Sequence, residues 1–230
     1  MGMTVFQRAR NQEQREVRRR AILGAATAML AEMPVAEVTL NELSRQAGLA
    51  KSNVLRYFES REAVLLELLD SQWRDWLEQL DRDLAAAVDP AGPATARCDQ
   101  LAAAVATSLA SRPMLCDLIS AQAAVLERNV SPQVAAQYKR ASLAGIAALG
   151  ELILGCVPEL GAPDAGKLAG ATVMTAGALW PHAQPSAAML AAYQADPELA
   201  ALRLDFIGTL REVLAVMSAG LLARGGHDGR

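Results

Sequence analysis

A short segment near the start of the chain groups residue types that suit DNA reading. Lys51, Ser52 and Asn53 stand together, and Arg56 and Tyr57 follow one helical turn later. Asn pairs bidentately with adenine, Arg pairs with guanine, and Ser bonds several base edges. Lys and a helix N-terminus favour phosphate. The same residues also suit the exposed side of an ordinary helical hairpin, so the spacing alone leaves both interpretations open.

Two short helices are expected to position these side chains. Thr39 fits the start of the first helix, with Glu42 at the reciprocal position of a capping box. Gly48 can take the left-handed conformation that ends it, and a second helix is expected over Ala50–Phe58. Apolar residues between the two helices supply a small core: Leu40, Leu43, Leu49, Val54 and Phe58. A helix, a tight turn and a second short helix are typical of a helix-turn-helix.

The rest of the chain also favours helices. Of the 230 residues, 52% are hydrophobic and 20% charged, which is enough to bury a core, and only 4% are aromatic. Pro and Gly punctuation and apolar periodicity predict further helices, several of them opened by a capping residue such as Ser60, Ser131 or Asp196. The expected ranges are 12–32, 61–88, 94–111, 114–128, 132–157, 164–179, 186–194 and 197–223. The fold class is therefore all-α, and the tail 225–230 is expected to fray.

Targeting and cysteine signals favour a cytoplasmic protein. The first 20 residues hold six arginines but no apolar core of a signal peptide. The most apolar run, 141–157, is interrupted by Glu151 and is shorter than the roughly 20 residues of a membrane span. Cys98, Cys116 and Cys156 form no metal or disulfide pattern, which indicates reduced, buried thiols. No cofactor, metal or membrane partner is predicted.

Charge is distributed unevenly along the chain. Residues 1–62 hold ten Lys and Arg against seven Asp and Glu, whereas the remainder holds twelve against eighteen. A basic front on an acidic body favours an anionic partner for the front alone. A solvated, charged helix end explains the same pattern equally well.

Three stretches resemble the N-terminal domain of the TetR family of bacterial transcriptional repressors. They are Arg20–Ala26, Val38–Leu43 and Ala47–Glu62. The agreeing features are the Thr cap, the Ala-Gly turn, the Lys of the recognition helix, the Tyr-Phe pair, and the Ser-basic-acidic opening of the next helix. The match covers a little over a fifth of the chain, and the length and helical remainder also fit.

The resemblance implies a role for each matching residue. Thr39 and Arg61 would hold phosphates, and Tyr57 would contact the DNA backbone. The residues that would face the major groove are Lys51, Ser52, Asn53, Leu55 and Arg56. Three departures are visible: Ala50 stands where the family often has a capping Ser, Leu55 where it often has Tyr, and Pro34 near a usual Gly. None of them removes the motif.

The resemblance divides the chain into two domains. Residues 1–62 would form a three-helix helix-turn-helix DNA-binding domain with a basic N-terminal arm. Residues 63–230 would form a helical bundle that binds a small effector and makes a homodimer. A broad apolar face on the last helix and small residues before it favour a two-fold helical seam, with burial inside one monomer as the alternative. The expected interface residues are Gly170, Ala171, Phe206, Leu210, Val213 and Met217.

An effector pocket is expected between the long helix from Arg61 and the middle helices. Few charges fall inside these apolar stretches, so the effector would be apolar or amphipathic. Ordinary core packing is the competing interpretation for each pocket residue, and His182 and His227 are placed in a loop and in the tail. The expected lining is Trp73, Trp76, Met114, Cys116, Gln122, Tyr138, Met174 and Trp180.

Together these features predict a ligand-responsive DNA-binding transcriptional regulator. It would act as a repressor, released from a palindromic operator by the effector, in the cytoplasm at the nucleoid. A DNA-binding regulator without an effector is the first alternative. A helical enzyme is disfavoured, because no catalytic Ser/His/Asp, Cys/His or paired-carboxylate spacing and no phosphate-binding Gly-rich loop occurs in the sequence.

Overall fold

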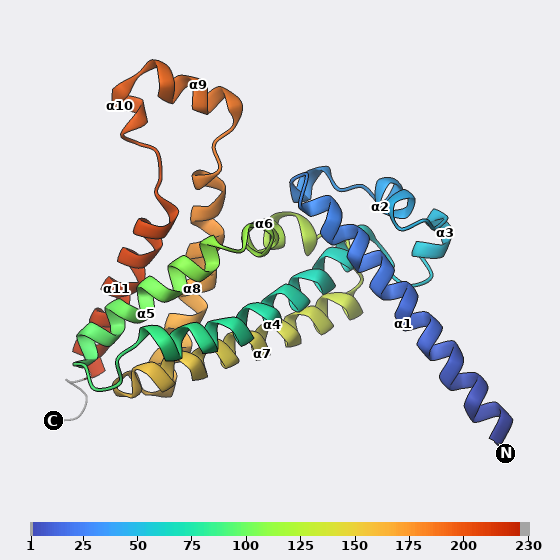
Figure 1. Ribbon diagram of the computed structural model, residues 1–230, viewed down its shortest axis with the longest axis horizontal. Helices are drawn as coiled ribbons and strands as arrows, with labels where there is room; N and C mark the ends of the chain where they lie inside the picture. Colours follow the sequence, from blue (N-terminus) through green and yellow to red (C-terminus); the bar gives the residue numbers. More distant parts are fainter. Residues whose placement is uncertain (1, 226–230) are drawn as a thin grey trace. The chain divides into compact units, whose positions relative to one another are not determined.

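The computed structural model describes residues 2–225, with side chains from Glu13 onward (Figure 1). This part of the chain is built from helices and contains no β-strand, which confirms the expected all-α class. The α-helices are α1 (Gly2–Leu30), α2 (Leu40–Gln46), α3 (Lys51–Val54), α4 (Arg61–Ala87), α5 (Ala94–Ala110), α6 (Pro113–Ala121), α7 (Pro132–Cys156), α8 (Gly161–Ala183), α9 (Ala187–Ala195), α10 (Pro197–Ala200) and α11 (Phe206–Gly225). Shorter turns are η1 (Val35–Glu37), the π-helical η2 (Gln122–Leu126) and η3 (Pro158–Leu160). The tail 226–230, with His227, lies outside the described residues.

The chain forms two compact units. The first contains Met1–Ser71 and Ala121–Lys139, and the second contains Gln72–Ser120 and Arg140–Arg230. Helices α4 and α7 each contribute residues to both units. The expected domain boundary after residue 62 stays a prediction, since the first unit also includes a segment from the middle of the chain.

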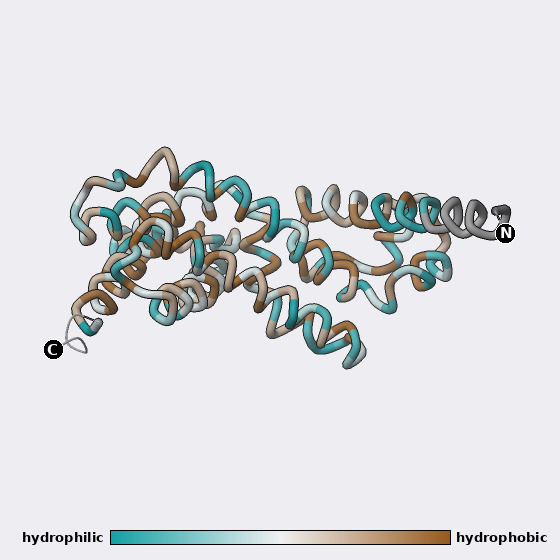
Figure 2. The backbone as a smooth tube through the Cα atoms, turned by 90° about the horizontal axis from the view of Figure 1, so that it is seen from below, coloured by the Kyte–Doolittle hydropathy of each residue, from teal (hydrophilic) through white to brown (hydrophobic). Residues whose placement is uncertain are grey.

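In the first unit, α1 begins earlier than expected, at Gly2 instead of residue 12, and ends at Leu30. Residues 13–20, hydrophilic except for Val17, precede a hydrophobic stretch from Ala21 to Leu30 of this helix (Figure 2). The hydrophobic half packs Ile22, Ala26 and Leu30 into the core of the unit. Pro34 follows in an extended conformation, which keeps the chain from continuing as helix.

Five of the expected helix starts carry side-chain caps. The Thr39 hydroxyl accepts a hydrogen bond from the Glu42 amide at 3.2 Å. The Glu42 carboxylate, which a complete capping box would return to the Thr39 amide, pairs with Arg45. The other four caps are Ser60 before α4, Ser131 before α7, Ser186 before α9 and Asp196 before α10. These local signals hold because each involves residues only two or three positions apart.

The second unit buries one side of α11 against α5 and α8. The buried residues of α11 recur every four positions: Phe206, Leu210, Leu214 and Ser218. The expectation of one helix over 197–223 is wrong, because the chain leaves α10 at Ala200 and starts again at Phe206. Asp205 precedes this second start, and its carbonyl accepts a hydrogen bond from the Thr209 amide at 2.9 Å.

Helices α9 and α10 contain no buried residue. They contact each other and project beyond the ends of α8 and α11 (Figure 1). Four large apolar side chains on or beside them are exposed: Met189, Leu190, Leu199 and Leu202.

By length and composition, one helix among residues 2–225 could cross a membrane, and it is α11. The bent pairs α5 with α6–η2 and α7 with η3–α8 also meet that criterion when each pair is taken together. The run 141–157, expected to be a buried helix, belongs mostly to α7. It buries Leu149 and Ile153 but exposes 68% of Leu143, so only one side of this run is core.

Candidate nucleic-acid interface and effector pocket

A turn at Gly48 joins α2 to α3. Gly48 has a φ of +65°, in the left-handed region that favours glycine. The Leu49 amide donates to the Ser44 carbonyl at 2.9 Å, which closes the turn. Val54 and Phe58 are buried beneath the second helix. The α2–turn–α3 segment is therefore a helix-turn-helix with its apolar side fixed in the core.

The second helix of this motif is shorter than expected. It covers Lys51–Val54 and continues as irregular turns to Phe58. Ala50 occupies the N-cap position without a side-chain hydrogen bond, as its departure from the family pattern implied. Lys51, Ser52 and Asn53 therefore lie on one helical turn. Leu55, Arg56 and Tyr57 lie on the irregular turns that follow.

The structure brings most predicted DNA-binding side chains to the surface of the first unit. Tyr57 is half-buried, and its carbonyl accepts a hydrogen bond from Arg19 at 3.1 Å. Arg61, also half-buried, differs from the others. It donates to the Val38 and Ala36 carbonyls and pairs with Glu62 at 3.0 Å. The exposed members of the set are Thr39, Lys51, Ser52, Asn53, Leu55 and Arg56.

The internal bonds of Arg61 give it a structural role. It ties the start of α4 to the loop before α2, and a phosphate contact by the same guanidinium would have to compete with these bonds. Its DNA contact stays a prediction.

Arg19 was not singled out from the sequence, and it also has a structural role. Its guanidinium pairs with Glu67 on α4 and lies 4.5 Å from the centroid of the Phe58 ring. Together with its bond to the Tyr57 carbonyl, these contacts join α1, α4 and the segment after α3. No local pattern in the sequence identifies this role, because its partners lie about 40 to 50 positions away.

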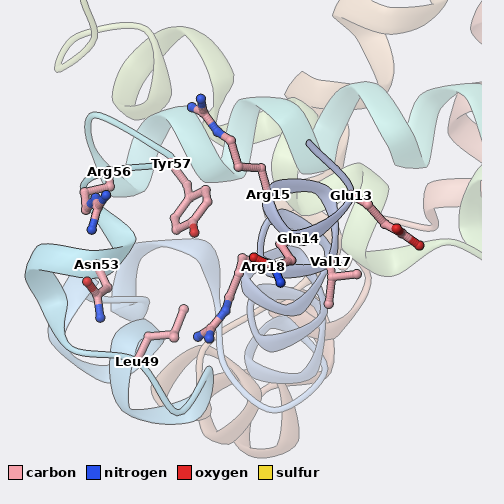
Figure 3. A pocket seen from close by; sticks show the side chains of 9 residues that line it. All are labelled: Glu13, Gln14, Arg15, Val17, Arg18, Leu49, Asn53, Arg56 and Tyr57. Atoms are coloured by element: carbon pink, nitrogen blue, oxygen red, sulfur yellow. The ribbon is translucent and has the colours of Figure 1, made fainter. Parts of the chain in front are cut away.

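A groove of about 940 Å³ opens between α1 and the helix-turn-helix (Figure 3). We call it the α1–α3 groove. Three of its nine lining residues, Asn53, Arg56 and Tyr57, belong to the predicted DNA-binding set. The other six are Glu13, Gln14, Arg15, Val17, Arg18 and Leu49. Sequence reasoning recognised the basic N-terminal arm, but it did not assign Arg15 and Arg18 to this site.

Titration shifts in the structure come from neighbouring charges and from burial. A hydrogen bond from Arg45 lowers the pKa of the exposed Glu42 carboxyl. Burial alone would raise the pKa of Glu127, but hydrogen bonds from Lys139 and Gln122 outweigh it and lower that pKa. Both shifts result from local ion pairs.

The eight predicted pocket residues lie on several helices of both units, and their common lining stays a prediction. Trp73 and Trp76 meet edge to face at 4.8 Å, and the Trp76 indole N–H donates to the Ser108 hydroxyl at 3.0 Å. The Trp180 indole N–H donates to the Asp117 carboxylate at 2.7 Å. The others are dispersed: Met114 is half-buried and Cys116 buried on α6, Gln122 and Tyr138 belong to the first unit, and Met174 is 77% exposed.

Trp73 is the unusual member of this set. Its indole N–H is buried and has no hydrogen-bond partner among the described residues. The indole lies against Gly145 of α7, so closely that a Cβ at that position would collide with the ring. A buried donor without an acceptor costs about 1–3 kcal/mol. At this point the contact between α4 and α7 is tight, and it leaves the indole N–H of Trp73 without an acceptor.

A small cavity lies elsewhere in the second unit. Its volume is about 10 Å³, which is room for one water at most. None of the eight predicted pocket residues lines it. Its lining is Cys98, Leu101, Ala102, Val105, Ile153, Leu168, Thr172, Leu214 and Ser218.

The predicted dimer-interface residues divide by exposure. Phe206 and Leu210 are core residues of their own chain, and Phe206 meets the Trp180 ring edge to face at 5.0 Å. Gly170, Ala171, Val213 and Met217 are half-buried. The exposed large apolar residues on the same two helices are Met174, Ile207 and Val216. Phe206 and Leu210 are therefore unavailable to a partner unless this core rearranges.

Comparison with known proteins agrees with this architecture. Residues 22–68 match the family described as bacterial regulatory proteins, tetR family, and residues 70–225 match the family described as tetracyclin repressor-like, C-terminal domain. The HTH-type transcriptional regulator EthR of Mycobacterium tuberculosis is 42% identical over 50 residues. That match spans 22% of this chain and only 23% of EthR.

Two solved structures share the fold over most of the chain. A putative transcriptional regulator from Pseudomonas aeruginosa PAO1 has a TM-score of 0.56 at 14% identity, covering 94% of this chain and 95% of that one. FadR of Thermus thermophilus, a TetR-family repressor in complex with lauroyl-CoA, has a TM-score of 0.54 at 18% identity, covering 90% and 94%.

The fold and its exposed recognition segment define an all-α helix-turn-helix protein. The two family matches together extend from residue 22 to residue 225. The chain belongs to the TetR family of bacterial transcriptional regulators.

Proposed function

We propose that this protein is a ligand-responsive DNA-binding repressor that acts in the cytoplasm at the nucleoid. The observation that carries this proposal is the exposure of Lys51, Ser52 and Asn53 on a short helix that Val54 fixes in the core, with Phe58 buried four residues further on. A fixed backbone with free polar side chains suits the major groove. The 50-residue stretch that is 42% identical to EthR supports the same function.

The repressor acts as a homodimer on a palindromic operator. Exposed apolar residues on α8 and α11 support a two-fold helical seam, with Met174, Ile207 and Val216 as its most exposed members. Single scattered apolar residues are normal on a surface, but here they lie on two neighbouring helices. A two-fold dimer places its recognition helices about one DNA turn, roughly 34–36 Å, apart.

The effector is apolar or amphipathic, and it enters by rearrangement of the helices. Support comes from the apolar lining of the small cavity beside Cys98 and Leu214, whose volume of about 10 Å³ holds no ligand as it stands. A more open cavity of about 400 Å³ lies between the end of α4 and the end of α7 in the same unit. The unsatisfied N–H of Trp73 offers a donor to an acceptor atom of the effector. Since α4 runs without a break from Arg61 to Ala87, movement of its second half is transmitted to the first unit.

DNA binding is tested with a duplex that the full-length protein selects from a random library. Asn53→Ala should weaken binding to the selected duplex by about 1–3 kcal/mol, because a base contact is lost, and leave binding to a random duplex unchanged. Lys51→Ala should weaken both duplexes and reduce the salt slope by about 0.9. Fluorescence anisotropy over a salt series measures both effects. A wild-type protein without preference for any selected duplex would contradict the proposal.

The effector is tested with lauroyl-CoA and dodecanoic acid as probes. Binding should change the emission of Trp73 and Trp76 and lower the affinity for the selected duplex. Linkage requires the duplex to weaken the probe by the same factor, typically 5–150-fold. An emission change with unaltered duplex affinity would favour the alternative of a regulator that needs no effector.

A further inference from the structure

We infer that the cavity of about 400 Å³ at the ends of α4 and α7 is a binding site for an amphiphilic organic cation, such as an alkylammonium. We call it the α4–α7 cavity. All of its lining residues belong to the second unit. None of the predicted DNA-binding residues and none of the eight predicted pocket residues lines it. The inference therefore goes beyond the proposed function and does not rest on it.

The α4–α7 cavity has the size and the floor of a small-molecule site. Ligand pockets usually measure about 300–1,000 Å³ and are lined mainly by apolar side chains. Here Leu84 and Val88, at the end of α4, are buried, and Leu152 of α7 is half-buried. Gly155 also lines the cavity, and a Cβ added to it would have no atom within 4 Å. The cavity therefore has an apolar floor with open space beside Gly155.

The two charged side chains that line the cavity are both acidic. Asp81 comes from α4 and Glu151 from α7, and both are exposed. No basic side chain in the described part of the chain pairs with either of them. Exposed carboxylates also occur elsewhere on this acidic unit, Glu198 and Glu212 among them, but these do not line the cavity. Two carboxylates beside an apolar floor suit a cation with an apolar body.

Arg97, the cation that reaches this region, is already bound to other groups. It donates to the Cys156 carbonyl at 2.7 Å and to the Gly92 carbonyl at 3.0 Å, and it pairs with Glu159. Burial raises the pKa of the Cys156 thiol, the Asp81 carboxylate raises it further, and Arg97 lowers it by a smaller amount. At the Cys156 sulfur, which lines the cavity, the negative charge of Asp81 therefore outweighs the positive charge of Arg97.

Two helix C-termini add to this negative potential. Helix α4 ends at Ala87 and α7 ends at Cys156, both beside the cavity (Figure 1). The C-terminal end of a helix carries a partial negative charge of about half an elementary charge, which favours a nearby cation. Neither helix has a basic residue in its last turn. A bound cation would therefore interact with these helix ends as well as with the two carboxylates.

The test compares three probes of the same chain length, namely decyltrimethylammonium, decanol and decanoate. Calorimetry uses the full-length protein, with each probe below its micellar concentration. Decyltrimethylammonium should bind about 2- to 30-fold more tightly than decanol, which is the range expected for two exposed ion pairs. Decanoate should bind more weakly than decanol. The bound cation should also protect Cys156 from N-ethylmaleimide, because this half-buried thiol lines the cavity.

Two variants change the cavity itself. Asp81→Asn/Glu151→Gln should weaken decyltrimethylammonium by about 2- to 30-fold, because both ion pairs are lost, and leave decanol unchanged. Gly155→Leu places a side chain in the open space and should abolish the binding of both probes. Helical circular dichroism checks that each variant is folded. If Gly155→Leu does not fold, the carboxylate variant still decides the question.

The matched control removes two exposed carboxylates that belong to the same unit but lie outside the cavity. Glu198→Gln/Glu212→Gln changes the net charge by the same amount as the cavity variant. It should change the affinity for decyltrimethylammonium by less than about 2-fold at about 0.15 M salt, where exposed charges beyond roughly 8 Å are screened. An equal loss in both double variants would overturn the inference, because it would reduce the effect to net charge.

Other results would also overturn the inference. Equal affinities for decyltrimethylammonium and decanol in the wild type would make the cavity a purely apolar site. Absence of cation binding, or binding without protection of Cys156, would mean that the cation is not held in this cavity. None of these measurements uses DNA, so a failure here leaves the proposed repressor intact, and a failure of duplex binding leaves this inference intact.

Discussion

The recognition segment of the first unit and the helical core of the second unit place their polar groups in opposite ways. In the first unit, Lys51, Ser52 and Asn53 point to solvent while Val54 anchors their helix. In the second unit, the polar atoms of Trp76 and Trp180 are inside and satisfied by Ser108 and Asp117. The first surface can bind without rearrangement, whereas a ligand that bonds to the indole of Trp76 or Trp180 must replace a hydrogen bond that already exists.

The largest expected effect comes from charging the core side of α11. Leu210 is fully buried, and Leu210→Asp should lower the free energy of unfolding by about 3–5 kcal/mol, because it buries an uncompensated charge. Val216 lies on the same helix but is 66% exposed. Val216→Asp should change stability by no more than about 0.5 kcal/mol, and it should weaken the proposed dimer.

Urea unfolding followed by tryptophan emission measures the first effect. Light scattering at micromolar concentration separates a dimer from the 24.3 kDa monomer. If Leu210→Asp remains as stable as wild type and only dissociates, then Leu210 belongs to the interface and the two sides of α11 have been exchanged. If Val216→Asp unfolds the protein, the predicted difference between the buried and exposed sides of α11 is wrong.

A smaller effect is expected where α4 meets α7. Gly145→Ala introduces a Cβ that collides with the buried Trp73 indole, and overpacking of this kind costs about 1–3 kcal/mol. Gly155 on the same helix has no atom within 4 Å of its added Cβ. Gly155→Ala should therefore stabilise by up to about 1 kcal/mol through helix propensity alone.

Thermal unfolding of the two glycine variants gives effects of opposite sign. The emission of Trp73 should shift in Gly145→Ala and stay unchanged in Gly155→Ala. If both variants are stabilised, the indole moves away at little cost, and the contact between α4 and α7 is looser than its unsatisfied N–H suggests.

The two units also differ in how far the sequence alone describes them. Caps at Thr39, Ser60 and Ser131 could be predicted because each depends on an amide three residues away. The stripe containing Phe206 and Leu210 was predicted as apolar, but periodicity cannot say whether the same chain or a partner covers it. Asp205 before an apolar run was the available signal that a separate helix starts at Phe206.

The candidate site shows the same limit. The side chains predicted to contact DNA bases lie within one short motif, so their spacing alone could identify them. The groove could not be predicted, because Arg15 and Arg18 are brought beside Asn53 only by the packing of α1 on the core. The predicted pocket residues share only their residue type, and residue type alone does not determine which side of a helix meets a neighbour.

The smallest expected effect concerns the cysteines, all three of which lie in the second unit. Cys98 and Cys116 are buried and free, and Cys156 is half-buried and free. Burial raises the pKa of the Cys116 thiol to about 12, so at pH 8 roughly one molecule in ten thousand carries its thiolate. In the native protein, a thiol reagent such as DTNB should therefore label Cys156 first and Cys116 last.

Cys116 also predicts the direction of a pH effect on stability. Its folded-state pKa lies above its unfolded value, near 9, so its neutral form contributes fully below pH 9. That contribution is lost as the pH rises from 9 toward 12, because the unfolded state releases its proton first. Cys116→Ala should flatten the decline of stability above pH 9, measured by urea unfolding at pH 8 and at pH 10. Two results together would contradict this prediction: Cys116 is labelled as fast as Cys156 at pH 8, and Cys116→Ala leaves the decline of stability above pH 9 unchanged. They would mean that the second unit opens freely around α6, so that its core is as accessible as the recognition segment.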